Sequence, residues 1–264
     1  MSATSLELAW SGDIATIRLN DPASLNAVTL VMIEAFDKAL DEVAGRARAL
    51  IVTGAGKGFC SGANLTGGLG VGERPADPSQ SDGGLVLETH INPLMSKLRD
   101  LPVPWISSVR GAAAGVGASL ALAADMVVAS ETAFFLQAFS RIGLVPDGGS
   151  SHLLVKTIGR PRAMELMLLG DRLPAKTALD WGLINRVVPD ADLESASLEL
   201  ATRLAQGAAS LKLIRKLAWT AVDGEWSKSL ATEREFQKAA GRTADHREGV
   251  AAFLGKRQAA FKGS

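Results

Sequence analysis

The chain has 264 residues, with 28 basic and 28 acidic side chains, 47% hydrophobic residues, 27 glycines, one cysteine and no tyrosine. That length predicts one large domain or two modest ones, with a core that needs no disulfide or structural metal, and excludes a small cross-linked module. Zero net charge gives no electrostatic drive toward a partner held by many phosphate contacts, so nucleic acid is an unfavoured partner.

The cysteine content and the N-terminal sequence both predict a cytoplasmic protein. Cys60 has no second cysteine with which to form a disulfide, and the start MSATSLELAW has neither a charged n-region nor an apolar h-region. The small-residue segment 111–129 is the one candidate for a membrane span, but its uncharged part is shorter than the roughly 20 residues that a bilayer needs. We therefore expect buried backbone there and no membrane partner.

The first half of the chain predicts alternating strands and helices. Residues 6–20 suit a β-hairpin, and a helical period follows from Val28 to Leu40, ending near Gly45. The apolar run 47–54 is typical of a strand buried on both faces. A further helix is expected around 85–100 and another from about Gly115, with apolar runs in the segments 103–111 and 125–130. This alternation favours an α/β fold.

Beyond Gly159 the pattern becomes helical, with one apolar run at 182–188. The helices are expected at 161–169, 175–181, 192–207, 209–222, 226–240 and 243–255. Between the core elements, the Gly- and Pro-rich stretch 66–84 predicts either a loop beside the site or a surface insertion.

Three glycine clusters, at 52–65, 109–120 and 143–151, invite a nucleotide-binding interpretation that their spacing does not support. Cys60 stands where a dinucleotide loop needs its third glycine, no Gly-Lys-Ser/Thr occurs in them, and a short-chain dehydrogenase needs a tyrosine. Glycines that follow a strand can instead open backbone N–H groups to a ligand and stabilise negative charge. Tight turns and close helix packing are an equal alternative.

Other chemical constellations find little support. The chain has no Gly-x-Ser-x-Gly elbow, and the three histidines at 90, 152 and 246 stand apart from one another. No motif supplies the carboxylates that a metal site would add to them, so no metal is expected. Cys60 is interpreted as a buried structural thiol rather than a nucleophile.

At this point the sequence resembles the crotonase superfamily, the enoyl-CoA hydratase/isomerase family. The similarity rests on IATIRLNDPASLNAVTLVM, ALIVTGAGKGFCSGANL, VRGAAAGVGASLALAADMVVAS, FSRIGLVPDGGSSHLL, LPAKTALDWGLINRVVP and DHREGVAAFLGKRQAAFKG, in the family's order. It implies a ββα spiral core with an acyl-CoA site over residues 1–200 and a helical trimerisation region over 201–264. It also implies a homotrimer or dimer of trimers, and a coenzyme A that enters as part of the substrate, with no separate cofactor.

The resemblance gives two glycine turns a role. It implies that the backbone N–H groups of Ala63 and Val116 hold the thioester oxygen, with Gly115 and Gly117 shaping the second turn. Fixed donors bind a growing enolate charge more strongly than a neutral carbonyl, and each is worth ~3–4 kcal/mol.

The resemblance also implies contacts with coenzyme A. These involve the backbone near Ser24, Asn26, Ala27, Asn64 and Leu65. Phe253, Lys256, Phe261 and Lys262 add adenine and phosphate contacts, across a subunit boundary in one arrangement. An amphipathic packing helix is the alternative for that C-terminal group.

The acid or base is the last question. Family hydratases use two glutamates, and the matching positions here hold Ser119, able to position water, and Phe139, which cannot transfer a proton. Asp147 lies where family isomerases carry an acid, in surroundings expected to raise its pKa; helix capping is its alternative use. The sequence therefore predicts a 3-enoyl-CoA to 2-enoyl-CoA isomerase. A hydratase, a ring-1,2-epoxyphenylacetyl-CoA isomerase and a non-catalytic acyl-CoA or RNA-binding scaffold stay open.

Overall fold

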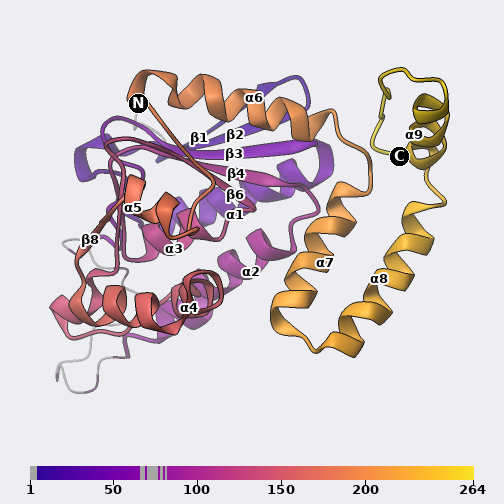
Figure 1. The fold of residues 1–264 in the computed structure, drawn as a ribbon. Coiled ribbons are helices and arrows are strands. Elements are labelled where there is room, and N and C mark those ends of the chain that lie inside the picture. Colours follow the sequence, from indigo (N-terminus) through magenta and orange to yellow (C-terminus); the bar gives the residue numbers. More distant parts are fainter. Residues whose placement is uncertain (1–4, 66–68, 70–76, 78–79, 81) are drawn as a thin grey trace.

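The structure, a computed structural model, describes residues 5–65, 69, 77, 80 and 82–264. Most of the expected 66–84 loop therefore lies outside the described residues. The described strands form a six-stranded sheet in the order β1-β2-β3-β4-β6-β9 and a three-stranded sheet in the order β5-β7-β8 (Figure 1).

The large sheet begins with the expected hairpin. Its strands are β1 (Leu6–Ser11), β2 (Ile14–Leu19), β3 (Ala49–Gly54), β4 (Trp105–Val109), β6 (Met126–Ser130) and β9 (Arg186–Val188). β1 pairs antiparallel with β2 across a two-residue turn in which Gly12 has φ +59°, a conformation that glycine adopts without strain. The other neighbours in this sheet are parallel, so the helices that connect them cover its faces.

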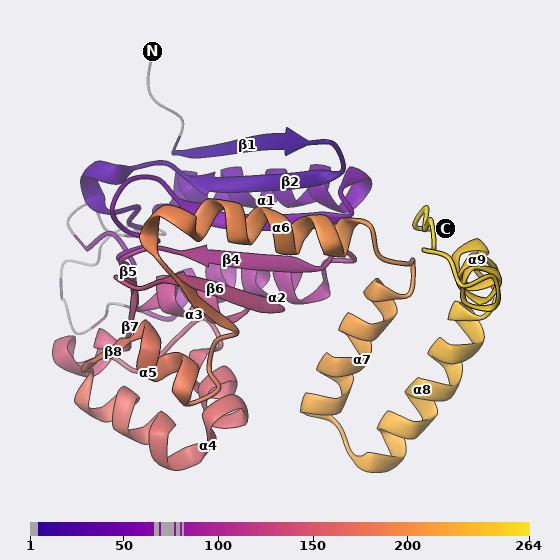
Figure 2. The ribbon, with the colours of Figure 1, turned by 45° about the horizontal axis from the view of Figure 1, so that its top comes forward.

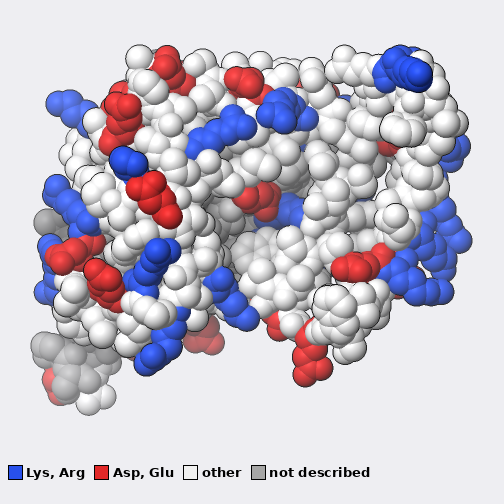
Figure 3. Space-filling view, in the orientation of Figure 1, with Lys and Arg blue, Asp and Glu red and all other residues white. Residues whose placement is uncertain are grey.

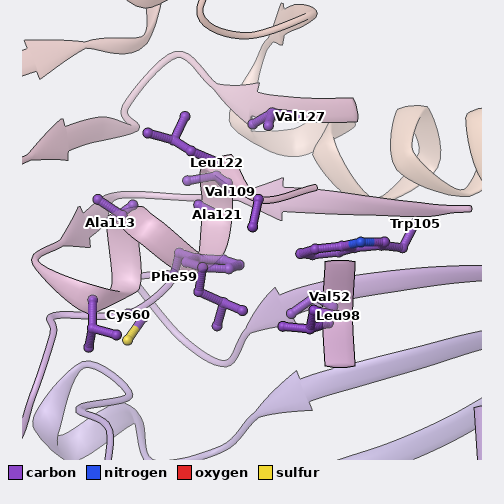
Figure 4. Packing of buried hydrophobic residues seen from close by; sticks show 14 of the residues in the cluster. Val52, Phe59, Cys60, Leu98, Trp105, Val109, Ala113, Ala121, Leu122 and Val127 are labelled. Atoms are coloured by element: carbon purple, nitrogen blue, oxygen red, sulfur yellow. The ribbon is translucent and has the colours of Figure 1, made fainter. Parts of the chain in front are cut away.

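Both faces of the large sheet are buried, as the apolar run 47–54 predicts. α6 (Leu193–Ala205) crosses one face (Figure 2). The sheet residues that pack against it are Ile14, Ala49, Ile51, Ile106 and Val128. Leu50 and Val52 point to the other face, toward α1 (Leu30–Arg46) and α2 (Asn92–Asp100). Figure 4 shows Trp105 beside Val52 and Leu98 on that second face.

The small sheet was not expected from the sequence. Its strands are β5 (Ala112–Ala114), β7 (Phe134–Leu136) and β8 (Arg172–Pro174), each too short to display a period of two. β5 follows β4 and leads into α3 (Val116–Leu122), and β7 follows β6 and precedes α4 (Ser150–Leu169). The chain thus repeats a strand of each sheet and then a helix, which is the expected ββα pattern.

The expected helices are present, with one clear correction. The helix predicted at 161–169 is the second half of α4, which starts at Ser150 and bends where Gly159 has φ +75° ahead of Pro161. The region 85–100 consists of a π-helical turn (Leu87–Ile91) followed by α2, and α5 spans Ala175–Asp180. Short 3-10 turns lie at Pro22–Ser24, Ala138–Ile142 and Asp190–Asp192.

The C-terminal helices α7 (Leu211–Asp223), α8 (Trp226–Ala240) and α9 (Ala244–Leu254) stand beside the sheets rather than on them (Figures 1 and 2). The expected division at residue 200 falls inside α6, which packs on the large sheet up to Ala205. The oligomerisation role of this region stays a prediction. Among the described residues, no helix is both long and apolar enough to cross a membrane.

Arg215 of α7 ties this helical region to the core. Its Nε donates to Asp125 Oδ2 at 2.7 Å, and its Nη groups donate to the carbonyls of Leu98, Arg99 and Leu101 at the end of α2. Asp125 Oδ2 also accepts the N–H of Trp105, the first residue of β4. One nearly buried guanidinium therefore joins α7, α2 and the starts of two strands.

We expect Arg215→Leu to lower the free energy of unfolding by about 3–5 kcal/mol, because it leaves Asp125 and three carbonyls without their donor in a buried place. Urea denaturation measures the change. The control is Arg141→Leu, whose partner Asp171 is exposed, and its loss should be below about 1 kcal/mol. Equal losses in the two variants would show that burial does not set the strength of the Arg215 contact.

Candidate functional site

The two glycine turns predicted to carry N–H donors lie against each other. Cys60 and Ala113 form a parallel bridge, in which Cys60 N–H donates to Ala112 and Ala114 N–H donates to Cys60, both at 2.9 Å. A Cβ built on Gly115 would lie 3.9 Å from the Cα of Gly62. The turn after β3 and the turn after β5 are therefore in van der Waals contact.

The glycines in these turns are required by turn conformation and by close packing, as one of the two alternatives predicted. Gly62 and Gly115 have φ of +101° and +52°, where L side chains are strained. Gly117 has an ordinary φ but no room, because a Cβ there would lie 2.5 Å from the Cys60 carbonyl oxygen. Backbone strain and close packing thus both require glycine, and together they bring the two turns into contact.

The N–H groups of Ala63 and Val116 each come one residue after that contact. Val28 bonds to the residues on either side of Ala63, accepting from Asn64 N–H at 3.0 Å and donating to the Gly62 carbonyl at 2.7 Å, so the Ala63 N–H faces away from Val28. Val116 begins α3, where the first N–H groups of a helix have no intrahelical acceptor. Within the described chain, neither N–H donates to a backbone acceptor.

Asp147 lies in a loop that packs against α3. The next residue, Gly148, lies so close to α3 that a Cβ on it would be 3.4 Å from Cγ2 of Val116. Asp147 Oδ1 is buried, and no described residue is a hydrogen-bond partner to it. Burial, with no compensating charge, raises the pKa of Asp147 to about 6.

The capping alternative for Asp147 does not fit the structure. α4 begins after Gly149, and no side chain caps its first turn. The backbone carbonyl of Asp147, not its carboxylate, takes part in this turn, accepting from the N–H of Ser150 at 3.1 Å and from its hydroxyl at 3.0 Å. The carboxylate is therefore left for another use.

The two residues that the resemblance matches to hydratase glutamates, Ser119 and Phe139, also lie in this region. Ser119 is fully buried, and its hydroxyl lies 2.9 Å from the carbonyl oxygen of Asp147 and 3.3 Å from that of Gly115. These contacts use the hydroxyl as a donor, and its expected water-positioning use stays a prediction. Phe139 places its ring 3.7 Å from where a Cβ of Gly115 would lie. Neither side chain brings a carboxylate to the site.

The residues expected to contact coenzyme A near the first turn have well-defined positions. Ser61 ties the turn to the segment 24–27, called the strip below. Its N–H donates to the carbonyl of Leu25, and its hydroxyl donates to the carbonyl of Ser24. Ala27 donates its N–H to the Ser24 hydroxyl at 3.1 Å. Leu65 is 72% exposed beside the turn, and Asn64 has its N–H bonded to Val28. Residues 24–27 and the turn are thus tied together by hydrogen bonds, although Asn26 and Ala27 are buried.

Asn26 has a structural function that the sequence did not reveal. It is completely buried, with φ +60°, and its amide nitrogen donates to the carbonyls of Ala55, Gly58 and Phe59. Its amide oxygen accepts the N–H of Asp21 at 2.9 Å. The side chain therefore holds residues 24–27 against the loop after β3, and the Asn26 N–H is itself donated to the Asp21 carbonyl at 2.8 Å.

The four C-terminal residues lie elsewhere in this chain. α9 and the C-terminus are at the opposite end of the molecule from α3 and α4 (Figures 1 and 2). Phe253 is 84% exposed, while Phe261 packs against Gly249 and its carbonyl accepts from Arg48 at 3.3 Å. Lys256 and Lys262 are exposed. The structure therefore does not bring this group to the two turns of the same chain.

The remaining expectations concern cysteine, metals and charge. Cys60 is fully buried and free, and burial raises its pKa to about 11, as suits the expected structural thiol. The described residues contain no cluster of His, Cys, Asp and Glu able to hold a metal ion. On the face shown in Figure 3, acidic and basic side chains are intermingled.

Comparison with known proteins agrees with this geometry. Residues 10–264 match the family model described as enoyl-CoA hydratase/isomerase. A 1,2-epoxyphenylacetyl-CoA isomerase of Escherichia coli K12 is 42% identical over 95% of both chains. A probable enoyl-CoA hydratase of Rhodobacter capsulatus is 39% identical over the full length of both. The crystal structure of an enoyl-CoA hydratase from Polaromonas sp. JS666 superposes with a TM-score of 0.88, at 33% identity, over 97% of this chain and 99% of that one.

The chain therefore belongs to the enoyl-CoA hydratase/isomerase family. The resemblance seen in the sequence is confirmed, and so is the α/β crotonase-like spiral fold. The protein is accordingly an enzyme of this family, and a small-molecule CoA thioester is its partner.

We expect Gly117→Ala to separate the two turns, because the new Cβ would meet the Cys60 carbonyl at 2.5 Å and its Sγ at 2.7 Å. Overpacking of this kind lowers stability by about 1–3 kcal/mol. Affinity for an acyl-CoA, measured by calorimetry, should fall with it. Gly45→Ala in α1 is the control, since a Cβ there meets no atom within 4 Å, and it should gain about 0.4–1 kcal/mol. Unchanged acyl-CoA binding by Gly117→Ala would contradict the importance of the contact.

Proposed function

We propose that the protein is an acyl-CoA isomerase that shifts a double bond from position 3 to position 2 of an enoyl-CoA. The observation that carries this proposal is the half-buried Asp147 carboxylate, whose Oδ1 is buried without a partner among the described residues and whose pKa is raised to about 6. The next residue, Gly148, packs its backbone against the helix that begins with Val116. A base with such a pKa is ionised at neutral pH yet readily returns its proton.

The reaction needs one base and one charge-stabilising site. The Asp147 carboxylate takes a proton from C2, and the electrons of the C2–H bond form the enolate. The enolate oxygen accepts hydrogen bonds from the N–H groups of Ala63 and Val116. The neutral Asp147 acid then returns the proton to C4, while the 3,4 double bond moves to the 2,3 position. Atoms and charge balance, and Asp147 ends as the carboxylate. The two donors act most strongly on the enolate, where charge has developed.

Hydration of a 2-enoyl-CoA is less well supported. Adding water requires one group to activate the water and another to deliver a proton. Ser119 has its hydroxyl bonded to backbone carbonyls, and Phe139 carries no proton to give. Asp147 alone suffices for an isomerisation, in which the proton that leaves is the proton that returns.

A second candidate is the isomerisation of a ring-1,2-epoxyphenylacetyl-CoA. The observation in its favour is the name of the E. coli relative, which matches this chain at 42% identity over 95% of its length. A non-catalytic scaffold is disfavoured by the same carboxylate, because a carboxylate oxygen buried without a partner lowers stability and has no use in a protein that only binds.

We expect Asp147→Asn to lower kcat at least about 100-fold with 3-enoyl-CoA thioesters, because general base catalysis is worth about 10²–10⁴. The KM should stay near that of the wild type, since the N–H donors are untouched. Stopped-flow assays with matched 2-enoyl-CoA, 3-enoyl-CoA and ring-epoxide thioesters distinguish the candidates. Rapid hydration of the 2-enoyl compound that persists in Asp147→Asn would overturn the proposal.

The pKa of Asp147 also predicts two pH dependences. Activity should rise with pH through about 6, as the carboxylate forms. Folding raises this pKa above its unfolded value, so the stability from this group is complete below about pH 4 and is lost as the pH rises through 6. Asp147→Asn should therefore unfold at higher urea than the wild type at pH 8, with the difference vanishing near pH 4. A variant less stable than the wild type at pH 8 would contradict the assigned burial.

The proposed substrate site extends to the Ser24 to Ala27 strip for the coenzyme, and the C-terminal Phe253, Lys256, Phe261 and Lys262 come from a neighbouring subunit. Two observations support assembly into trimers or dimers of trimers. No residue of α8 is buried, and α7, α8 and α9 enclose an open, largely apolar cavity of about 980 Å³. An isolated chain would leave that surface exposed to water. The cytoplasmic location stays a prediction.

We expect the wild type to sediment as a trimer or hexamer, and Leu254→Asp to shift it toward a monomer. Leu254 is 76% exposed and lines the apolar cavity, where a charge would be buried on assembly at a cost of several kcal/mol. Analytical ultracentrifugation measures the masses. Val31→Asp, at a 67% exposed position on α1, is the control and should keep the wild-type mass. A monomeric wild type would end the assembly proposal.

A further inference from the structure

The helix that begins with Val116 also holds the loop that carries Asp147. Ser119 lies one turn along α3, and its hydroxyl is 2.9 Å from the Asp147 carbonyl oxygen. Ser119 is completely buried, so no water competes for this hydrogen bond at its surface. A side chain on the helix of the proposed enolate site is thus bonded to the backbone of the proposed base.

The neighbouring residue makes this contact tight. Gly148 has φ +58°, and a Cβ on it would lie 2.9 Å from Cβ of Ser119 and 3.4 Å from Cγ2 of Val116. The loop backbone therefore rests directly on α3, with no gap that a side chain or a water could fill. The hydrogen bond fixes the direction of the Asp147 peptide, and the glycine contact fixes its height above the helix.

Other bonds to the same carbonyl do not do this. Ser150, the first residue of α4, donates both its N–H and its hydroxyl to the Asp147 oxygen, but it lies only three residues further along the chain. Those bonds shape the turn into α4 without tying it to α3. In the described part of the chain, the Ser119 hydroxyl is the hydrogen-bond donor that joins this loop to α3.

We propose that Ser119 is a positioning residue for the reaction, which sets the distance between the Asp147 carboxylate and the enolate held at the start of α3. This inference rests on the proposed function, because it needs Asp147 to be the base. A misplacement of about 1 Å between a base and its carbon lowers the rate up to about 100-fold. Ser119 touches neither substrate nor proton, and it acts only through the backbone of Asp147.

The test is Ser119→Ala, which removes the hydroxyl and keeps the Cβ. We expect kcat for the 3-enoyl-CoA isomerisation to fall about 10- to 100-fold with the KM and the acyl-CoA dissociation constant unchanged. The acid limb of the kcat profile should also move below pH 6, because a loosened loop lets water reach the carboxylate. A merely structural serine would lower stability without moving that limb.

Ser197→Ala is the matched control. Ser197 is equally buried, and its hydroxyl donates to Ser108 at 2.9 Å on the α6 side of the large sheet. It should keep the wild-type kcat and pH profile, whatever its melting temperature. Gly148→Ala opens the same contact from the loop side, and it should reproduce the kinetic signature of Ser119→Ala.

The outcomes separate this inference from the proposed function. If Asp147→Asn abolishes isomerisation while Ser119→Ala keeps the wild-type kcat and pH limb, Asp147 stands and the positioning role of Ser119 is wrong. If Asp147→Asn keeps full activity, both fail. A fall in kcat with a displaced acid limb in Ser119→Ala and Gly148→Ala, but not in Ser197→Ala, supports the positioning role.

Discussion

The close approach of the backbone after β3 to the backbone after β5 is the constraint on which the site depends. Cys60 and Ala113 bridge the two segments, and Gly117 passes the Cys60 carbonyl with no room for a Cβ. A backbone N–H group has no flexible side chain to extend its reach. Two such donors can therefore bind one oxygen only if their backbone segments lie close together. Packing and electrostatics are here one requirement, because the contact that closes the core also brings the donors together.

α3 joins the two halves of the chemistry. In the proposed reaction its first residue, Val116, provides one donor, and its next turn carries Ser119, whose hydroxyl donates to the Asp147 carbonyl. Distances within one helix vary little, so a base fixed to it keeps a constant separation from the donor at its start. The buried anchor at Arg215 secures the neighbouring strands and α2 in turn. The packing of the core therefore determines the position of the carboxylate.

The sequence predicted features whose signal is local. The hairpin, the doubly buried β3 and the glycine turns follow from period, turn chemistry and the absence of side chains, and the family pattern led to Asp147. Features set by distant contacts were missed. The strands of the small sheet are three residues long and exist only because each pairs with a remote segment. The buried amide of Asn26 bonds to carbonyls about thirty residues away, and no spacing rule reveals such a partner.

Asp147 Oδ1 is buried with no hydrogen-bond partner among the described residues. Such an oxygen is unfavourable for folding, so its persistence needs a structural explanation. The raised pKa of Asp147 has burial as its cause, and the hydroxyls of Ser119 and Ser150 donate to its backbone carbonyl. If a serine capped the carboxylate directly, the same hydroxyl would stabilise the ion and lower the pKa, and the base would become weaker. Holding the residue by its backbone avoids this conflict. The loop is fixed while the acid keeps its proton affinity, which follows from which oxygen of Asp147 the serines contact.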